Sequence, residues 1–182
     1  MPTFVSLLRG INVSGQKKIR MADLRSLYEG LGFTGVQSYI QSGNVVFDAP
    51  VKGAGTLVER IEAAIQQAYA FEVPVVIRTH DELQQVVAGC PFGSVDVDKD
   101  GTRVAVAFLS GEPTAAGVDS MAPMVVSPEK LVVVGCEAYL HYPDGMGKSK
   151  LTTALLEKRL GVTATARNWK TVLRLVELSR SV

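Results

Sequence analysis

The chain has 182 residues, of which 47% are hydrophobic and 20% are charged, and its formal net charge is +1. This composition can bury a core in one large domain or two small ones, and it excludes an intrinsically disordered chain. The longest apolar runs, such as residues 131–134, are as short as a strand, so we expect no membrane-spanning helix. The N-terminus does not resemble a signal peptide, so we expect a cytoplasmic protein.

The charge is unevenly distributed along the chain. Residues 1–47 carry a net charge of +3, residues 48–139 carry −7, and residues 140–182 carry +5. If the two ends of the chain meet in the fold, they form a basic face on a nearly neutral protein. The alternative is that these charges belong to ordinary solvated faces of helices.

The predicted elements of the first half follow the order βαββαβ. Apolar residues recur at every third or fourth position in residues 21–31, which predicts a helix that ends before Gly32. Polar turn residues separate the strands predicted at 36–40 and 45–47, which indicates a hairpin. The other predicted elements are a strand at 4–8, a helix at 56–69 and a strand at 73–79.

The second half shows nearly the same order of elements, after a short helix at 81–87 and an irregular connector at 90–101. Its predicted strands are at 103–109, 131–134, 138–142 and 162–165, and its predicted helices are at 113–121, 149–160 and 168–178. No repeat of individual residues is visible between the halves, so the predicted duplication rests on the pattern of elements.

These elements predict an α+β fold with two ferredoxin-like (βαββαβ) subdomains packed together and an extra C-terminal helix. The first subdomain is predicted at residues 1–80. A helix and connector follow at 81–101. The second subdomain, with its terminal helix, is predicted at 102–182.

Three segments carry a likeness to a known family. They are LLRGINVSG at 7–15 with MADLR at 21–25, YIQSGNVVF at 39–47, and SKL at 149–151 with TARNWKTV at 165–172. From residue 4 to about residue 178, the chain resembles the domain-of-unknown-function 1697 family of mainly bacterial proteins. The resemblance implies a fold of two related α/β subdomains. It implies no activity, because the family has none established.

Residues 145–149, with the sequence GMGKS, resemble a phosphate-binding loop because they follow a strand and precede a predicted helix. A Walker loop also requires a glycine where this chain has Tyr142, so the pattern fails. We interpret Ser149 as the N-cap of the predicted helix. A simpler anion site stays open, in which N–H groups at the helix start, together with Lys148 and Lys150, bind a phosphate or carboxylate.

Two polar segments of the first half are further candidates. The loop at residues 9–18 contains more polar groups than a linker needs, which is typical of functional loops. The turn at residues 41–44 either donates side-chain hydrogen bonds to a ligand or only closes the hairpin. The candidate ligand-binding residues of the two segments are Arg9, Asn12, Lys17, Gln41, Ser42 and Asn44.

Residues 167–170 contain the only tryptophan of the chain. In a functional interpretation, Trp169 stacks on a base or sugar while Arg167 and Lys170 contact phosphate. In a structural interpretation, Asn168 caps the last helix and Trp169 packs into the core, as most tryptophans do. The structural interpretation is the stronger of the two, and all four residues stay candidates.

Metal binding and catalysis have little support in the sequence. Residues 96–101 resemble the first half of a calcium loop, but the twelfth position is Ala107 rather than glutamate, so we interpret them as an acidic turn. Cys90 and Cys136 lack metal-ligand spacing. We interpret His80 as part of a helix cap, and no nucleophile has a base nearby in the sequence. We expect no metal and no cofactor.

The best-supported function is a binding module for a small anionic ligand, phosphorylated or carboxylated, in a basic cleft between the subdomains. The polar loops at residues 9–18, 41–44, 144–150 and 167–170 are predicted to form this cleft. Two alternatives stay open. One is a single-stranded nucleic-acid-binding protein, which the net charge does not support. The other is an enzyme that acts on a phosphorylated metabolite. The residues decide neither enzymatic activity nor oligomeric state.

Overall fold

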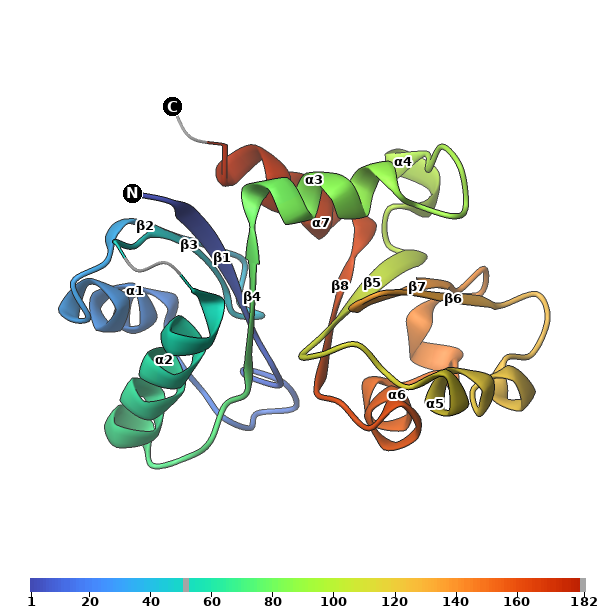
Figure 1. Cartoon of the computed structure of the whole chain (residues 1–182), viewed down its shortest axis with the longest axis horizontal. Coiled ribbons are helices and arrows are strands. Elements are labelled where there is room, and N and C mark those ends of the chain that lie inside the picture. The colour runs from blue at the N-terminus through green and yellow to red at the C-terminus, as the bar shows by residue number, and fades with distance from the viewer. Residues whose placement is uncertain (51–52, 181–182) are drawn as a thin grey trace. The chain divides into compact units, whose positions relative to one another are not determined.

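The computed structural model describes residues 1–50 and 53–180, and Figure 1 shows its elements. The chain divides into two compact units. The first unit consists of Met1–Gln84 and the C-terminal segment from Leu175 onward, and the second consists of Gln85–Arg174. One four-stranded sheet lies in each unit.

The first sheet contains β1 (Thr3–Leu8), β2 (Thr34–Tyr39), β3 (Asn44–Asp48) and β4 (Val75–Thr79). The strand order is β2-β3-β1-β4, and every neighbouring pair is antiparallel. The helices α1 (Met21–Gly30) and α2 (Ala54–Tyr69) cover one face of this sheet (Figure 1). This is the ferredoxin-like arrangement that the predicted order of elements indicated.

The core of the first unit lies between this sheet and its two helices. Leu57, Ile61 and Ile65 recur every four residues on α2 and are fully buried, because this spacing keeps them on one face of the helix. From the sheet, the ring of Phe47 stacks on that of Phe33, with centroids 4.7 Å apart. These rings and the buried aliphatic residues of α2 belong to one hydrophobic cluster, which forms the core of the first unit.

The buried hydroxyl of Tyr28, on α1, makes the stability of the first unit sensitive to alkaline pH. The hydroxyl lies 2.7 Å from Ser6 Oγ on β1. Burial raises the pKa of Tyr28 far above its ordinary value of 10, while the hydrogen bond to Ser6 acts in the opposite direction. In the unfolded chain the phenol ionises near pH 10. The raised pKa therefore stabilises the fold fully below about pH 10, and this contribution is lost as the pH rises further.

We expect the Tyr28→Phe variant to lose part of this alkaline dependence. At neutral pH the substitution should lower the free energy of unfolding by about 1 kcal/mol, because it removes one buried hydrogen bond. Above about pH 10 the stability of the variant should fall less steeply than that of the wild type. Urea unfolding from neutral pH to about pH 11 measures both effects, and equal alkaline slopes would contradict the assignment.

The second sheet repeats this topology. It contains β5 (Val104–Leu109), β6 (Lys130–Val134), β7 (Glu137–His141) and β8 (Ala164–Asn168). The strand order is β6-β7-β5-β8, again with antiparallel neighbours. The helices α5 (Ala115–Asp119) and α6 (Thr153–Leu160) lie on one face (Figure 1), and the 3-10 turn η1 (Ala122–Met124) follows α5. The α+β fold of two ferredoxin-like subdomains is therefore confirmed.

Three further α-helices lie among the described residues 53–180: α3 (His80–Ala88), α4 (Val97–Asp100) and α7 (Trp169–Leu178). The first of these follows β4 directly, and α7 follows β8 directly, which confirms the extra C-terminal helix. The short α4 lies inside the segment that was predicted to be an irregular connector. Asp96 begins it, because its carboxylate accepts hydrogen bonds from the N–H groups of Asp98 and Lys99.

The structure reveals one arginine at an equivalent position in the two sheets, which the sequence did not show. Arg78 on β4 pairs with Val5, and Arg167 on β8 pairs with Val106, each opposite the third residue of the first strand of its sheet. Each guanidinium donates to the carbonyl of the preceding residue at 2.9 Å. Each sheet therefore has an arginine at the same register position of its fourth strand, with the same local hydrogen bond.

The residues that follow these arginines cap the next helix in both cases. Thr79 and Glu82 form a capping box on α3, since the N–H of each donates to the side chain of the other. The interpretation of His80 as the cap was wrong, because its Nδ1 lies 2.9 Å from Ser179 Oγ instead. Asn168 Oδ1 accepts from the N–H of Thr171 at 2.9 Å, which confirms the predicted cap of the last helix.

The start of α6 differs from the prediction. Residues 146–148 form the 3-10 turn η2 (Met146–Lys148), and Ser149 is extended, with ψ of 147°. The helix begins at Thr153 because Thr152 is its N-cap and accepts from the N–H of Leu155. The prediction that Ser149 caps this helix was therefore wrong. Its hydroxyl accepts from the N–H of Leu151 at 3.0 Å, ahead of the helix.

Candidate functional site

Two of the four predicted polar segments meet at one end of the first sheet. Residues 9–20 connect β1 to α1, and residues 40–43 connect β2 to β3. The pairing of Leu7 with Asn44 places the end of β1 beside the start of β3. The N–H of Leu8 then donates to the carbonyl of Gly43 at 2.8 Å.

The side chain of Asn12 ties the long loop to this hairpin turn. Its Nδ2 donates to the carbonyls of Ile19 and Gln41, at 2.9 and 2.8 Å. The N–H of Ile19 donates back to Asn12 Oδ1 at 2.9 Å. Three hydrogen bonds thus hold the loop in one conformation, so the predicted candidate Asn12 positions the site as well as bordering it.

Unusual backbone conformations gather at this end of the sheet. The described residues include five non-glycine residues with positive φ, namely Asn12, Ser14, Lys17, Ile40 and Ala70. The first four lie in the two loops, and Ala70 ends α2 at the same end of the sheet. Each such residue costs roughly 1–2 kcal/mol, and strain of this kind concentrates at ligand sites.

A cavity of about 610 Å³ opens between these segments. This volume is in the range of small-molecule sites, which is roughly 300–1,000 Å³. Two of the predicted residues, Asn12 and Gln41, line it. The other lining residues are Gly15, Lys18, Ile19, Arg20, Asp23 and Tyr69.

The charged groups of this loop cavity lie where α1 begins. Arg20 is the N-cap residue, but its side chain makes no capping hydrogen bond. Its guanidinium instead contacts Asp23 of the first turn, with Nε 2.8 Å from Oδ2, and this hydrogen bond raises the pKa of Arg20. Lys18 adds a second, exposed cation. Two cations thus outweigh one carboxylate beside the positive end of a helix dipole.

The remaining predicted residues of the first unit are engaged elsewhere. Lys17 Nζ donates to the backbone carbonyl of Glu72 at 2.5 Å. Asn44 is fully buried, and its Nδ2 donates to Tyr39 O and Ser42 Oγ, so these side chains close the hairpin. Arg9 is half-buried beside β4, where its N–H donates to Pro74 O.

The predicted loop of the second unit, residues 144–150, borders a separate cavity of about 620 Å³. Lys148 lines it, whereas the exposed Lys150 and the half-buried Ser149 do not. Its other lining residues are Thr102, Arg103, Glu129, Pro143, Asp144 and Gly145. Two cations face two carboxylates here, so this cavity has no excess of positive charge.

Residues 167–170 contribute less exposed surface than a stacking site needs. Trp169 is buried, with 4% of its surface exposed, which agrees with the structural interpretation. Arg167 is 7% exposed, and its guanidinium donates to Thr165 Oγ1 at 2.7 Å. Burial lowers the pKa of Arg167 to about 10. Lys170 is exposed, and its backbone N–H donates to Gly101 O.

The four predicted loops occupy different ends of the two equivalent sheets. Residues 9–18 and 41–44 lie at the end where the first strand of the first sheet finishes. Residues 144–150 and 167–170 lie at the end where the first strand of the second sheet starts, since Val104 pairs with His141 and Ala105 with Asn168. A single cleft formed by all four loops stays a prediction.

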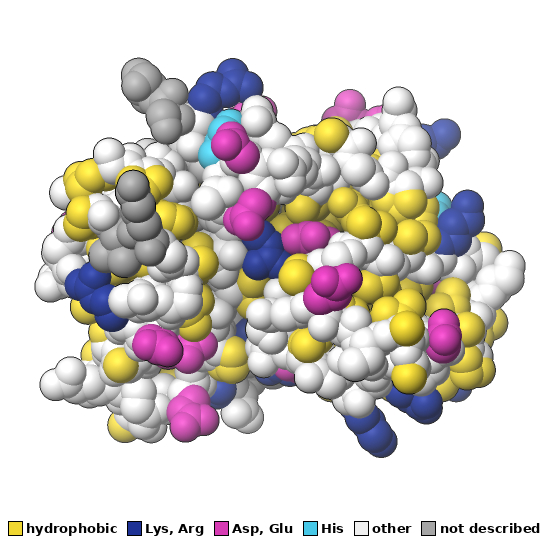
Figure 2. All heavy atoms as spheres, in the orientation of Figure 1, with side chains coloured by type: hydrophobic (Ala, Val, Ile, Leu, Met, Phe, Trp, Pro, Cys, Tyr) yellow, Lys and Arg dark blue, Asp and Glu magenta, His cyan; other side chains and the backbone are white. Residues whose placement is uncertain are grey.

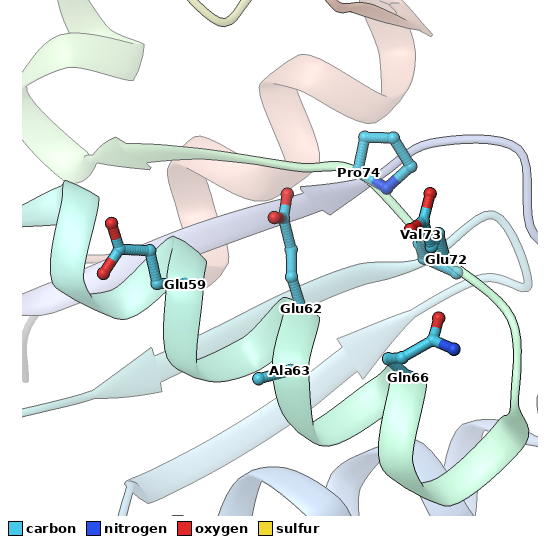
Figure 3. A pocket seen from close by; sticks show the side chains of 7 residues that line it. All are labelled: Glu59, Glu62, Ala63, Gln66, Glu72, Val73 and Pro74. Carbon is cyan, nitrogen blue, oxygen red and sulfur yellow. The ribbon is translucent and has the colours of Figure 1, made fainter.

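A further cavity of the first unit, of about 440 Å³, lies between α2 and the segment that leads into β4 (Figure 3). Glu59, Glu62 and Glu72 line it, and Glu62 accepts a hydrogen bond from the N–H of Val75 at 2.9 Å. Its carboxylates make it unsuitable for an anion.

On the face shown in Figure 2, Lys and Arg side chains lie scattered among acidic ones, so anion binding there depends on local groups.

Metal-ligating side chains do not cluster in the part of the chain that the structure describes: it contains no group of three or more His, Cys, Asp or Glu arranged to hold a metal. Asp96 of the calcium-like segment is used as a helix cap. Among residues 1–50 and 53–180, no helix is both long and apolar enough to cross a membrane.

Sequence reasoning selected the polar loop at 9–18, which includes Lys18, but it missed Arg20, Asp23 and Tyr69 of the cavity lining. Arg20 and Lys18 flank the buried Ile19 directly before a helix, and this alternation is a signal that could have identified Arg20. Tyr69 had no such signal, because it reaches the cavity from the far end of α2.

The two antiparallel sheets of equivalent strand order define a protein of two ferredoxin-like subdomains. The family model described as "Protein of unknown function (DUF1697)" matches residues 1–139, and the chain belongs to this family. This confirms the resemblance seen in the sequence.

Among solved structures, the chain is similar to the conserved bacterial protein SP0830 from Streptococcus pneumoniae. The two share 23% sequence identity with a TM-score of 0.69, and the match covers 98% of this chain and 99% of that one. At this identity the likeness shows the fold alone. No curated protein matches the chain.

Proposed function

We propose that the chain is a binding module for a small anionic ligand, phosphorylated or carboxylated, and that the loop cavity of the first unit holds the anion. The observation that carries this proposal is the position of Lys18 and Arg20 beside the start of α1, where the N-cap residue Arg20 has no side-chain acceptor for the first N–H groups of the helix. Helix N-termini flanked by cations are suited to phosphate and carboxylate groups.

The difference between the two subdomains supports the same choice. The connection from β1 to α1 spans residues 9–20, whereas the equivalent connection from β5 to α5 spans only residues 110–114. The longer loop contributes five of the cavity's lining residues and holds a strained conformation through Asn12. A long, ordered loop on a rigid sheet is the usual location of a binding site.

A thermal-shift titration with inorganic phosphate, ribose 5-phosphate and citrate tests the proposal. A ligand at 100 times its dissociation constant should stabilise the protein by about 2.7 kcal/mol, which raises the melting temperature by about 5–10 °C for a chain of this size. Lys18→Ala and Arg20→Ala should each weaken binding about tenfold or more, because each removes a charge-assisted hydrogen bond.

Lys158→Ala is the matched control, since Lys158 is an exposed lysine on α6 of the second unit and is not one of the residues that line this cavity. It should bind the same anions as the wild type. An anion-induced shift that survives in Lys18→Ala and Arg20→Ala would refute the assignment of the site. If short single-stranded RNA stabilises the protein instead, with a steep dependence on salt, the nucleic-acid alternative replaces this proposal.

A further inference from the structure

An aromatic wall faces the cations of the loop cavity. Tyr69 is the last residue of α2, and the left-handed Ala70, with φ of 58°, turns the chain directly after it. The turn places the Phe71 ring against Tyr69, with centroids 5.6 Å apart and planes 25° apart. Tyr69 is half-buried and lines the cavity, so a ring of fixed orientation borders the ligand space.

The Tyr69 hydroxyl lies within electrostatic reach of both charged groups at the start of α1. Burial raises the pKa of Tyr69 above its ordinary value, the charge of Asp23 raises it further, and the charge of Arg20 acts in the opposite direction. The phenol is therefore neutral at physiological pH and can donate a hydrogen bond. One cavity thus combines a neutral aromatic ring with the cations Lys18 and Arg20.

Gln41 adds a group that both donates and accepts hydrogen bonds. Its side chain is exposed and lines the cavity, and its backbone carbonyl is held by Asn12 Nδ2 at 2.8 Å. A carboxamide on a fixed backbone can pair with the polar edge of a flat heterocycle. An isolated phosphate could accept hydrogen bonds from such polar groups, but it would leave the face of the Tyr69 ring without a stacking partner.

From this combination we infer that the ligand is a nucleoside monophosphate, with its base against Tyr69 and its phosphate at Lys18 and Arg20. The inference rests on the proposed function and specifies its ligand class. Aromatic rings stack on any of the four bases, and cations beside a helix start bind the phosphate. The cavity of about 610 Å³ is in the size range of sites for ligands that carry both groups.

Calorimetric titration with AMP, GMP, CMP, UMP, adenosine and ribose 5-phosphate tests this inference. The tightest of the four nucleotides should bind about tenfold or more tightly than ribose 5-phosphate, because only the nucleotides have a base that stacks. The aromatic protons of the bound base should also shift upfield in the NMR spectrum. If no nucleotide binds more tightly than ribose 5-phosphate, the inference is wrong.

Three variants separate the contributions of the base and the phosphate. Tyr69→Leu should remove the advantage of the nucleotide and leave the affinity for ribose 5-phosphate unchanged, whereas Tyr69→Phe should retain the advantage. Lys18→Ala should weaken the binding of the nucleotide and of ribose 5-phosphate equally. If Tyr69→Leu does not fold, the comparison of nucleotide with ribose 5-phosphate in the wild type still decides the question.

The outcomes distinguish this inference from the proposed function. If ribose 5-phosphate binds in a Lys18-dependent way and the nucleotides gain nothing over it, the anion site stands and the nucleotide assignment fails. If no anion of either series binds, both fail. A nucleotide advantage that survives unchanged in Tyr69→Leu would also overturn the assignment of the base to this wall.

Discussion

Replacing Gly43 with alanine is expected to destabilise the first unit by about 2–4 kcal/mol. Gly43 has φ of 86°, a conformation that L-residues adopt only at a cost. An added Cβ would lie 2.7 Å from Leu8 Cβ and 2.9 Å from Ile11 Cδ1, both in fully packed surroundings. Conformational strain and overpacking therefore add together at this one position.

Gly10→Ala is the matched control for this substitution. Gly10 also has positive φ, of 71°, but an added Cβ there would have no heavy atom within 4 Å. Its replacement should therefore cost only the conformational part, about 1–2 kcal/mol. Urea unfolding of the two variants measures the difference. Equal losses would show that the packing of the hairpin turn against Leu8 and Ile11 is unimportant.

The second large effect is expected for Asn12→Ala, with a loss of about 2–4 kcal/mol. The substitution removes three hydrogen bonds, each contributing about 1 kcal/mol, and puts alanine at a φ of 54° that asparagine tolerates better. Anion affinity should fall as well, because Lys18 and Gln41 lose their fixed spacing across the cavity.

Asn12→Gly separates the two causes, since glycine adopts positive φ without strain and lacks the side-chain hydrogen bonds. Its free energy of unfolding should lie between those of the wild type and Asn12→Ala. Amide exchange at Ile19, whose N–H donates to Asn12, should accelerate in both variants. Wild-type stability of Asn12→Gly would mean that the hydrogen bonds contribute nothing.

Local sequence pattern was sufficient for the order of elements and therefore for the fold. The stripe Leu57, Ile61 and Ile65 predicted α2. The polar residues 41–44 between two strand-like segments predicted the hairpin, whose connection spans residues 40–43 in the structure. These signals come from residues that are close together in the sequence. They can therefore be recognised without knowing which distant residues are in contact. With six elements in the order βαββαβ, only a few sheet topologies are compatible, and the observed one is the ferredoxin-like order.

Cap positions were less predictable because several residues in a row can form them. Both Ser149 and Thr152 are suitable N-caps by type, and the structure uses Thr152, after an extended segment that buries Leu151. In the same way, the capping box of Thr79 and Glu82 replaced the cap expected at His80. The packing of neighbouring apolar residues decides between such candidates.

Residue chemistry was a good guide to candidate groups and a poor guide to their role. Asn12 and Gln41 were selected as polar residues of two loops, and both border the cavity. Lys17, selected by the same reasoning, donates to Glu72 O instead, and its neighbour Lys18 lines the cavity. The two neighbouring lysines therefore have different surroundings, and the sequence does not show which of them lines the cavity.

The order of elements, the ferredoxin-like duplication and the family were already contained in the amino-acid sequence, because hydrophobic spacing and long motifs are local properties. The loop cavity was decided only by tertiary structure. It brings Tyr69 from the end of α2 to Lys18, Arg20 and Gln41, and such contacts depend on how the helices pack on the sheet. The equivalence of Arg78 and Arg167 became visible only when the two sheets aligned the strands that carry them.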